Sequence, residues 1–500
     1  MKKIIFIVIL LSGTYTFSQV QLDLKGTANK KINSEIREGD EVTLTGMGLD
    51  GIGLRKAYFE SNARQYEEMA DQIKKVDFAP ATVKDFWQLR ALEEGVYASL
   101  VEHGMQYNLR SSVQKDALKY DRWLQERNLI YEDAYLESYL QALVFKLFPL
   151  RLNDGRSGVL RVRIEKSNIP NAMVYPTGTI YITTGLLSVL RSEEELLAIL
   201  AHEIAHWALD HWIMNINAAI ERQERAEAWA LFATSVAAMA DVYVAFNNDY
   251  YEPGLITALG GTVSSIIAAE VLERLGIEYN HEQELKADQV ATELLNFIGI
   301  NPSALSTALS RIAVYNYEAG NYSVFHASYT HPKLGERIEI LGNPESFKST
   351  DFDIHISFIN THNAILEFNN LNLDLANELV DRNISAGVAV ADDYLIKAKS
   401  IIYMYDNTEK NKEALGLLNK ASELNSNNPG EIYKNEAILY LRLGQNSKAK
   451  ESLINFKRNV ENSFHLLEVY KGTDEVYRIH EYLTKDLNWA DNMLQKVELL

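Results

Sequence analysis

Two histidines and a glutamate in the segment Ala201–His206 have the spacing of a metal-binding helix. His202 and His206 are four residues apart, so on a helix both imidazoles lie on one face and can reach a single ion. Glu203 follows His202 directly and can act beside the same ion. The chain has no cysteine, so the ligands must be His, Asp or Glu, which points to one zinc ion. We therefore predict a zinc site in which Glu203 is a general base.

A third protein ligand must come from elsewhere in the chain. The metzincin pattern needs glycine at position 209 and histidine at position 212, where this chain has Leu209 and Trp212. A thermolysin-like site needs a glutamate about twenty residues after the second histidine, with an aspartate four residues later. Three glutamates lie near this distance, but none has an aspartate four residues later, so none fits the pattern: Glu221, Glu224 and Glu227. Glu284 and Asp288 lie one helical turn apart, so we expect Glu284 to ligate the metal and Asp288 to orient a ligand histidine.

The surrounding sequence predicts the elements that position these residues. Ser192 and Glu195 form a capping box that starts a helix running through Trp207, which carries both histidines. Short strand-like runs precede it at 159–165, 171–175 and 179–184. We expect an α+β zincin, mostly helical, with a small antiparallel sheet beside the metal helix. An exposed edge strand within 171–184 would bind an extended polypeptide substrate.

Composition and charge exclude several classes of protein. A chain of 500 residues is too long for one compact core, so we expect two or three domains. It has 49 Lys and Arg against 68 Asp and Glu, a formal charge of -19, which argues against a nucleic-acid partner and a polybasic membrane anchor. The absence of cysteine excludes disulfide scaffolds, thiolate zinc fingers and cysteine nucleophiles.

The N-terminus has the pattern of a secretory signal peptide at 1–18. Two lysines at positions 2 and 3 precede an apolar run at 4–11, and the small residues Thr16 and Ser18 follow. The apolar run is too short to span a bilayer comfortably, which argues against an uncleaved anchor. We therefore expect an exported protein, periplasmic in the first instance, with an extracellular location as the alternative.

Residues 19–118 have the pattern of a helical N-terminal extension. Within 54–75, apolar residues recur at intervals of three and four, namely Ala57, Tyr58, Met69 and Ile73. The glycines at 46, 48 and 51 match a dinucleotide-binding fingerprint in outline. No strand with a ribose-binding acid follows at the right distance, so we interpret these glycines as a flexible loop.

The region 355–500 contains a repeat. Tyr394 and Ala398 recur as Tyr433 and Ala437, 39 residues later, and Ala414 and Leu418 recur as Ala449 and Leu453, 35 residues later. A helix–turn–helix repeat of about 34 residues accounts for both and resembles tetratricopeptide repeats, with an irregular helical domain as the alternative. Such repeats build concave surfaces, so we expect a protein partner there.

Two strongly apolar segments, 228–246 and 255–271, lie between His206 and Glu284. Each is interrupted by an acid, and neither has flanking clusters of Lys and Arg. We interpret them as a helical hairpin over the active site. Burial within the protein is favoured, and peripheral membrane contact through 228–271 is the alternative.

Several ordered motifs lie between about 119 and 345. They are Asn171-Ala172…Pro176-x-Gly178, Thr184-Gly185-Leu186-Leu187, His202-Glu203-x-x-His206, His211, Glu284-x-x-Ala287-Asp288 and Thr330-His331-Pro332…Arg337-Ile338. This set resembles the HtpX, CAAX-prenyl-protease and BepA group of gluzincin peptidases. The resemblance implies a zinc metallopeptidase domain over 119–345, and the added repeats make BepA-like periplasmic members the best comparison.

The resemblance also implies roles for two residues near the end of that domain. In BepA-like members, the histidine that matches His331 lies close to zinc and can gate the site, and the arginine that matches Arg337 supports the same region. Pro332 holds the residue before it in an extended conformation, so His331 would point in a defined direction. Alternatively, His331 or Arg337 stabilises the tetrahedral oxyanion. The catalytic candidates are therefore Glu203, His331 and Arg337. His211 has no clear role, and by default we interpret it as a histidine on the helix surface or one that supports a metal ligand.

Together these patterns predict an exported zinc endopeptidase of envelope protein quality control, with substrate or partner recruitment by helical repeats. A chaperone or scaffold with a latent metal site and a non-peptide hydrolase are the alternatives, and the intact Glu203 argues against a dead site. We also expect the repeats to be separable. A chain ending near 350 should fold and keep zinc, because few contacts are expected across a boundary at 343–350.

Overall fold

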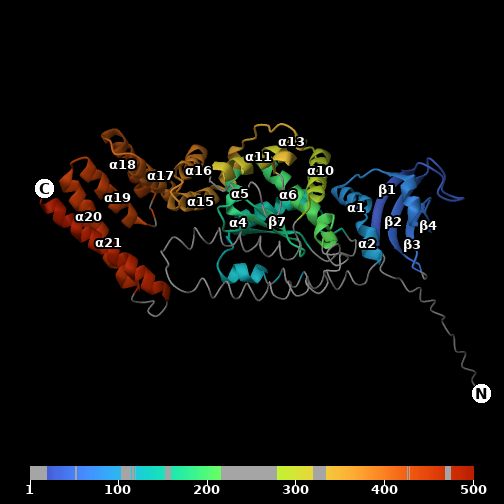
Figure 1. Ribbon diagram of the computed structural model, residues 1–500, viewed down its shortest axis with the longest axis horizontal. Helices are drawn as coiled ribbons and strands as arrows, with labels where there is room; N and C mark the ends of the chain where they lie inside the picture. The colour runs from blue at the N-terminus through green and yellow to red at the C-terminus, as the bar shows by residue number, and fades with distance from the viewer. Residues whose placement is uncertain are drawn as a thin grey trace, which may run out of the picture.

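The computed structural model describes residues 20–50, 53–102, 114, 118, 120–152, 159–215, 279–318, 334–424, 426, 428–467 and 474–499. Among these residues, no helix combines the length and the apolar character needed to cross a membrane. The signal peptide expected at 1–18, the apolar segments within 228–271 and His331 lie outside the described residues and stay predictions. Along the longest axis of the molecule, an N-terminal sheet is followed by a central part and then by C-terminal helices (Figure 1).

The N-terminal part is a five-stranded antiparallel sheet, so the helical extension predicted for 19–118 is wrong over its first half. The strands are β1 (Val20–Ala28), β2 (Glu41–Leu49), β3 (Arg55–Ser61), β4 (Arg64–Met69) and β5 (Val76–Phe78), in the order β4-β3-β2-β1-β5, with the 3-10 helix η1 (Ala70–Lys75) before β5. Alternate residues of β1 are buried, which is the period of a strand with one face on a core.

The apolar spacing within 54–75, which predicts a helix, has a different cause. β3 and β4 form a hairpin whose turn residues, Asn62 and Ala63, both have positive φ, at 50° and 58°. Such a two-residue turn matches the twist of the paired strands, and it places the apolar residues of 54–75 on separate elements. Gly46 and Gly48 lie inside β2, so the interpretation of these glycines as a loop is also wrong.

Helix α1 (Val83–Glu93) packs on both the N-terminal sheet and the central part, and α2 (Val96–Glu102) follows it. Leu89 and Ala91 belong to the core of the sheet, whereas Phe86 and Trp87 belong to the central core. The Trp87 indole Nε1 donates to the Leu147 carbonyl at 2.7 Å. A boundary at 118–119 therefore does not separate two independently packed parts.

The central part contains a small sheet surrounded by helices. The strands β6 (Arg161–Glu165), β7 (Ala172–Val174) and β8 (Thr179–Thr183) lie within the predicted ranges and are ordered β6-β8-β7. β7 and β8 pair antiparallel, as expected, but β6 pairs parallel to β8, so the sheet is mixed. The helices are α4 (Ala134–Leu147), α5 (Thr184–Val189), α6 (Glu193–Ala208), α10 (His281–Phe297), α11 (Ser303–Glu318) and α13 (Leu334–Leu341). β7 contacts α6, which places a sheet edge beside the helix of the two histidines.

Beyond residue 349 the described chain is helical. The helices are α14 (Thr350–His355), α15 (Ser357–Asn369), α16 (Leu373–Ala386), α17 (Ala391–Met404), α18 (Thr408–Glu423), α19 (Pro429–Arg442), α20 (Asn446–Leu467) and α21 (Asp474–Glu498). From α15 onward, consecutive helices pack on one another, and α14 packs on α16. The two copies of the repeat pattern fall on equivalent pairs, α17–α18 and α19–α20, and their alanines are buried. The assignment to tetratricopeptide repeats stays a prediction.

The expected break between 345 and 355 is wrong, because α14 and α15 are part of the central core. Phe352, Ile356 and Ile359 are fully buried in that core together with residues of α5, α6 and α11. Helix α16 adds a polar anchor, since the buried Arg382 pairs with Asp353 and donates to carbonyl groups at the end of α5. Local sequence could not reveal this packing, because the partners lie more than 150 residues away along the chain.

Candidate metal centre

Helix α6 is built so that its C-terminal half carries a buried polar group. The Ser192 hydroxyl caps the first turn by accepting from the Glu195 amide, and three glutamates in that turn suit the positive end of the helix dipole. The expected start of the helix is thereby confirmed. From Glu195 to Ala208 every residue is buried, so His202, Glu203 and His206 are enclosed by the protein.

Helix α10 brings the acidic residues to the same place. It starts with a capping box between Asn280 and Gln283, so Glu284 lies in its first turn and Asp288 one turn later. Both carboxylates are buried, with Glu284 fully so. α10 packs along α6, which turns the spacing of 284 and 288 into contact with the two histidines.

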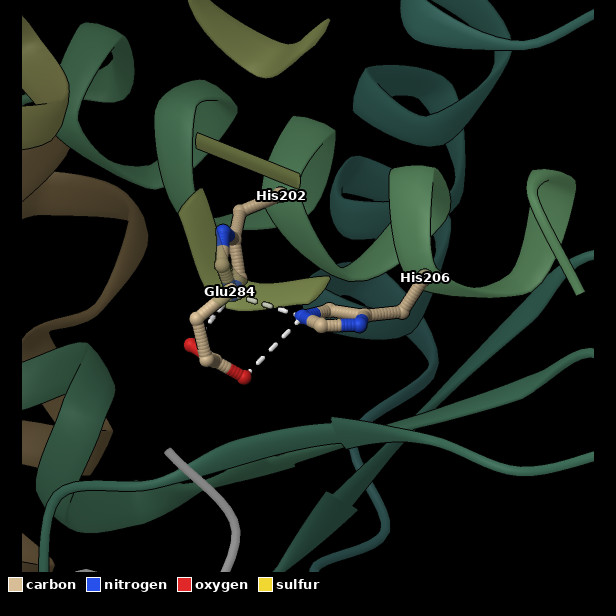
Figure 2. A group of neighbouring side chains, drawn as sticks. All are labelled: His202, His206 and Glu284. Atoms are coloured by element: carbon tan, nitrogen blue, oxygen red, sulfur yellow. Dashed lines mark hydrogen bonds and ion pairs between the residues drawn. The ribbon is translucent and has the colours of Figure 1, made fainter. Parts of the chain in front are cut away.

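The three expected ligands converge. His202 and His206 project from α6 toward Glu284 (Figure 2). The two Nε2 atoms are 3.1 Å apart, His206 Nε2 is 3.3 Å from Glu284 Oε1, and His202 Nε2 is 3.6 Å from Glu284 Oε2. Four ligands at bond lengths of about 2.0–2.1 Å around a tetrahedral ion lie about 3.3 Å from one another. The geometry and the donor types therefore fit a small divalent metal ion.

A buried aspartate and arginine support two of these ligands. Asp288 Oδ1 is 2.8 Å from His202 Nδ1, the ring nitrogen that faces away from Glu284. Arg337, on α13, donates from Nε and Nη2 to the two oxygens of Asp288 at 2.7 Å each, and its Nη1 lies 2.7 Å from Glu284 Oε2. The structure thus brings Asp288 and Arg337 to the site, with Arg337 bound to carboxylates on three of its nitrogens.

These contacts change the titration of both groups. Burial alone would raise the pKa of Asp288, but the charge of Arg337 and the contact with His202 outweigh it and hold the pKa below its usual value. Burial would lower the pKa of Arg337, yet Glu284 and Asp288 raise it above its usual value. The pair therefore stays ionised, which keeps the Asp288 carboxylate available as an acceptor for His202.

Two further residues complete the surroundings of His206. His211 Nδ1 lies 2.9 Å from His206 Nδ1, and the Tyr279 ring stacks on the His206 ring with centroids 3.6 Å apart. Burial lowers the pKa of His206 well below its usual value, and it lowers that of His211 to about 4, so both imidazoles are neutral. Sequence reasoning left His211 between the helix surface and support of a metal ligand, and the structure places it against His206. It missed Tyr279, which no spacing signal relates to His206.

Comparison with known proteins places this site in a family. Residues 135–345 match the family model of peptidase family M48. These residues form an M48 peptidase domain. The M48 domain of this chain contains every residue of the site described above, whereas the N-terminal sheet and helices α14–α21 lie outside the matched range.

Individual relatives agree with this placement. The chain is 23% identical to the mitochondrial metalloendopeptidase OMA1 of Schizosaccharomyces pombe, over 42% of this chain and 54% of the relative. It is 27% identical to a Vibrio cholerae protein with the provisional name beta-barrel assembly-enhancing protease, over 44% of this chain and 41% of the relative. A CAAX prenyl protease 1 homolog of Arabidopsis thaliana is 26% identical, over 43% and 48%. The chain spans about half the length of these curated relatives, which support a metal-dependent peptidase function for the M48 domain.

Proposed function

We propose that this protein is an exported zinc-dependent endopeptidase. The observation that carries the proposal is the buried group of His202, His206 and Glu284, whose donor atoms have the separations of a tetrahedral site. Two imidazoles and one carboxylate are a ligand set of zinc hydrolases that keep a fourth position open. The names of the M48 relatives support peptide bonds as the target.

Glu203 is placed to move the proton in this reaction. Bound zinc would supply a Lewis acid that polarises the scissile carbonyl and acidifies a water molecule. Glu203 is buried on α6 and follows His202 directly, so its carboxylate would be the base that accepts a proton from the attacking water and returns it to the leaving amine. The β7 edge beside α6 would hold the substrate extended by adding it as a strand.

Arg337 has a different role from the oxyanion stabiliser considered above. Its Nε, Nη1 and Nη2 atoms all face the carboxylates of Glu284 and Asp288 at 2.7 Å. A guanidinium used in this way holds a metal ligand and the carboxylate that supports another. We assign Arg337 as a positioning residue, and His331 keeps the gating role that the sequence suggested.

The cellular role combines the site with features outside the M48 domain. The signal-peptide pattern at 1–18 supports export to the periplasm. The equivalent pairs α17–α18 and α19–α20 support recruitment of a substrate or partner protein by the C-terminal helices. Together they suit a peptidase of envelope protein quality control.

Metal analysis combined with a protein digest tests the proposal. The purified full chain should contain about one zinc per molecule and cleave an unfolded protein such as casein, and a chelator should stop cleavage. Glu203→Gln should keep the zinc and abolish cleavage, because the substitution removes only the base. Glu194→Gln, on the first turn of the same helix, is the matched control and should change neither. Cleavage that survives the chelator, or normal turnover by Glu203→Gln, would refute this function.

A further inference from the structure

The two ligand histidines are held in different ways. His202 has a carboxylate behind it, since Asp288 Oδ1 is 2.8 Å from His202 Nδ1. Behind His206 stands a second imidazole, with His211 Nδ1 at 2.9 Å from His206 Nδ1. Both histidines of this second pair are buried. The contact between His206 and His211 therefore occupies the place that a carboxylate or a carbonyl usually takes behind a ligand histidine.

The direction of the chain after α6 produces this contact. Residues five apart on a continuous helix point about 140° away from each other, so His211 would face away from His206. Helix α6 ends at Ala208, and Asp210 adopts a left-handed conformation with φ of 56°. The chain then starts a new helical turn at 211, and Gln283 of α10 donates to the His211 carbonyl at 3.2 Å. The turn and this anchor return the His211 ring to His206.

The geometry determines where the protons lie. His206 Nε2 faces Glu284 and His202, so a metal would be bound through this nitrogen. A neutral imidazole that ligates through Nε2 carries its proton on Nδ1 and donates it. His211 Nδ1 must then be the acceptor, and the proton of His211 lies on its own Nε2.

A neutral acceptor also suits the charge of the site. The buried carboxylates of Glu203, Glu284 and Asp288 act on the buried guanidinium of Arg337, and the buried carboxylate of Asp210 acts on His211. A neutral imidazole beside His206 Nδ1 adds no charge to this group, whereas a further carboxylate there would add to the buried negative charge.

We propose that His211 is a positioning residue of the metal centre. It accepts the Nδ1 proton of His206, fixes the tautomer of that ligand and orients its Nε2 atom toward the metal. The inference rests on the proposed zinc site, and it adds a residue that acts through His206 and does not touch the substrate.

Zinc affinity of the full chain, measured by competition with a chelator of known affinity, tests the proposal. His211→Phe keeps a planar ring and removes the acceptor, so zinc affinity should fall about 10- to 100-fold. His211→Asn offers an oxygen near the position of Nδ1 and should stay within about threefold of the unmodified protein, whereas His211→Gln offers it near Nε2 and should lose affinity. His281→Gln is the control, because His281 lies on α10 and contacts Glu336 but not His206.

The outcomes separate this inference from the function it rests on. If the unmodified chain binds no zinc, the proposed function fails. If it binds zinc and His211→Phe binds equally well, or His211→Asn loses as much as His211→Gln, the positioning role is refuted. Should His211→Phe not fold, the comparison of Asn with Gln decides. In cobalt-substituted protein, the visible bands of His211→Gln should shift and those of His211→Asn should not, a readout independent of turnover.

Discussion

Removing the C-terminal helices should unfold the M48 domain, contrary to the expectation from sequence that a chain ending near 350 folds. A chain that ends at residue 349 loses Phe352, Ile356 and Ile359, which are at most 1% exposed in the central core. Each covers an apolar area on the remaining core comparable to its own, worth about 1.5–3 kcal/mol. The newly exposed surface therefore costs about 5–9 kcal/mol, a large share of a typical stability of about 5–15 kcal/mol.

Polar contacts that cross the same boundary add to this cost. Glu367 on α15 accepts from Asn168 at 3.0 Å and from the Tyr315 hydroxyl at 2.6 Å, which ties the loop before β7 to α11. Without α15, Asn168 in this loop and Tyr315 on α11 both lose the Glu367 carboxylate as a hydrogen-bond acceptor. Since the loop leads into the strand beside the metal helix, we expect the damage to reach the metal site.

A second truncation provides the matched comparison. A chain that ends at Gly387, the left-handed cap of α16, keeps the three apolar residues and the pair of Arg382 with Asp353. The test compares the melting temperature and the zinc content of the two truncated chains and the full chain. We expect the chain that ends at 387 to unfold cooperatively and bind zinc. The chain that ends at 349 should melt at least about 10 °C lower or not fold. If the chain that ends at 349 has the same melting temperature as the chain that ends at 387 and binds zinc, the shared core is refuted.

In the presence of a chelator, Arg337→Met should lower the free energy of unfolding by about 3–5 kcal/mol, because Glu284 and Asp288 stay buried without their cation. Added zinc should recover part of this loss, and urea titrations measure both effects. Burial, assisted by a nearby lysine, lowers the pKa of His362 to about 4. Below about pH 6.5 the unfolded chain protonates this histidine and the folded chain does not. The free energy of unfolding should therefore fall by at most about 3 kcal/mol as the pH is lowered from about 6.5 to 4. His362→Gln should flatten this slope, measured from denaturant midpoints. His331→Ala should raise peptide cleavage if His331 gates the site, whereas a fall would assign it to catalysis.

The metal centre was predictable from sequence to the extent that it depends on local spacing. Four residues bring His202 and His206 to one face of a helix in any protein, and the same interval relates Glu284 to Asp288. The cap at Ser192 and the strands within 159–184 were also recognisable, since a capping residue and an alternating pattern act over a few neighbours. The order of the small sheet was not, because pairing β6 parallel to β8 depends on how the chain crosses over.

Only the tertiary structure decided the features that depend on distant partners or on single backbone angles. The left-handed turns at Asn62 and Asp210 carry no glycine, yet one makes a hairpin out of an apparent helix and the other returns His211 to His206. The burial of Phe352 and Ile356 reflects surfaces contributed by α5 and α6, which a local pattern does not contain. Helical periodicity after residue 350 therefore identified the helices but not the core that they share with the M48 domain.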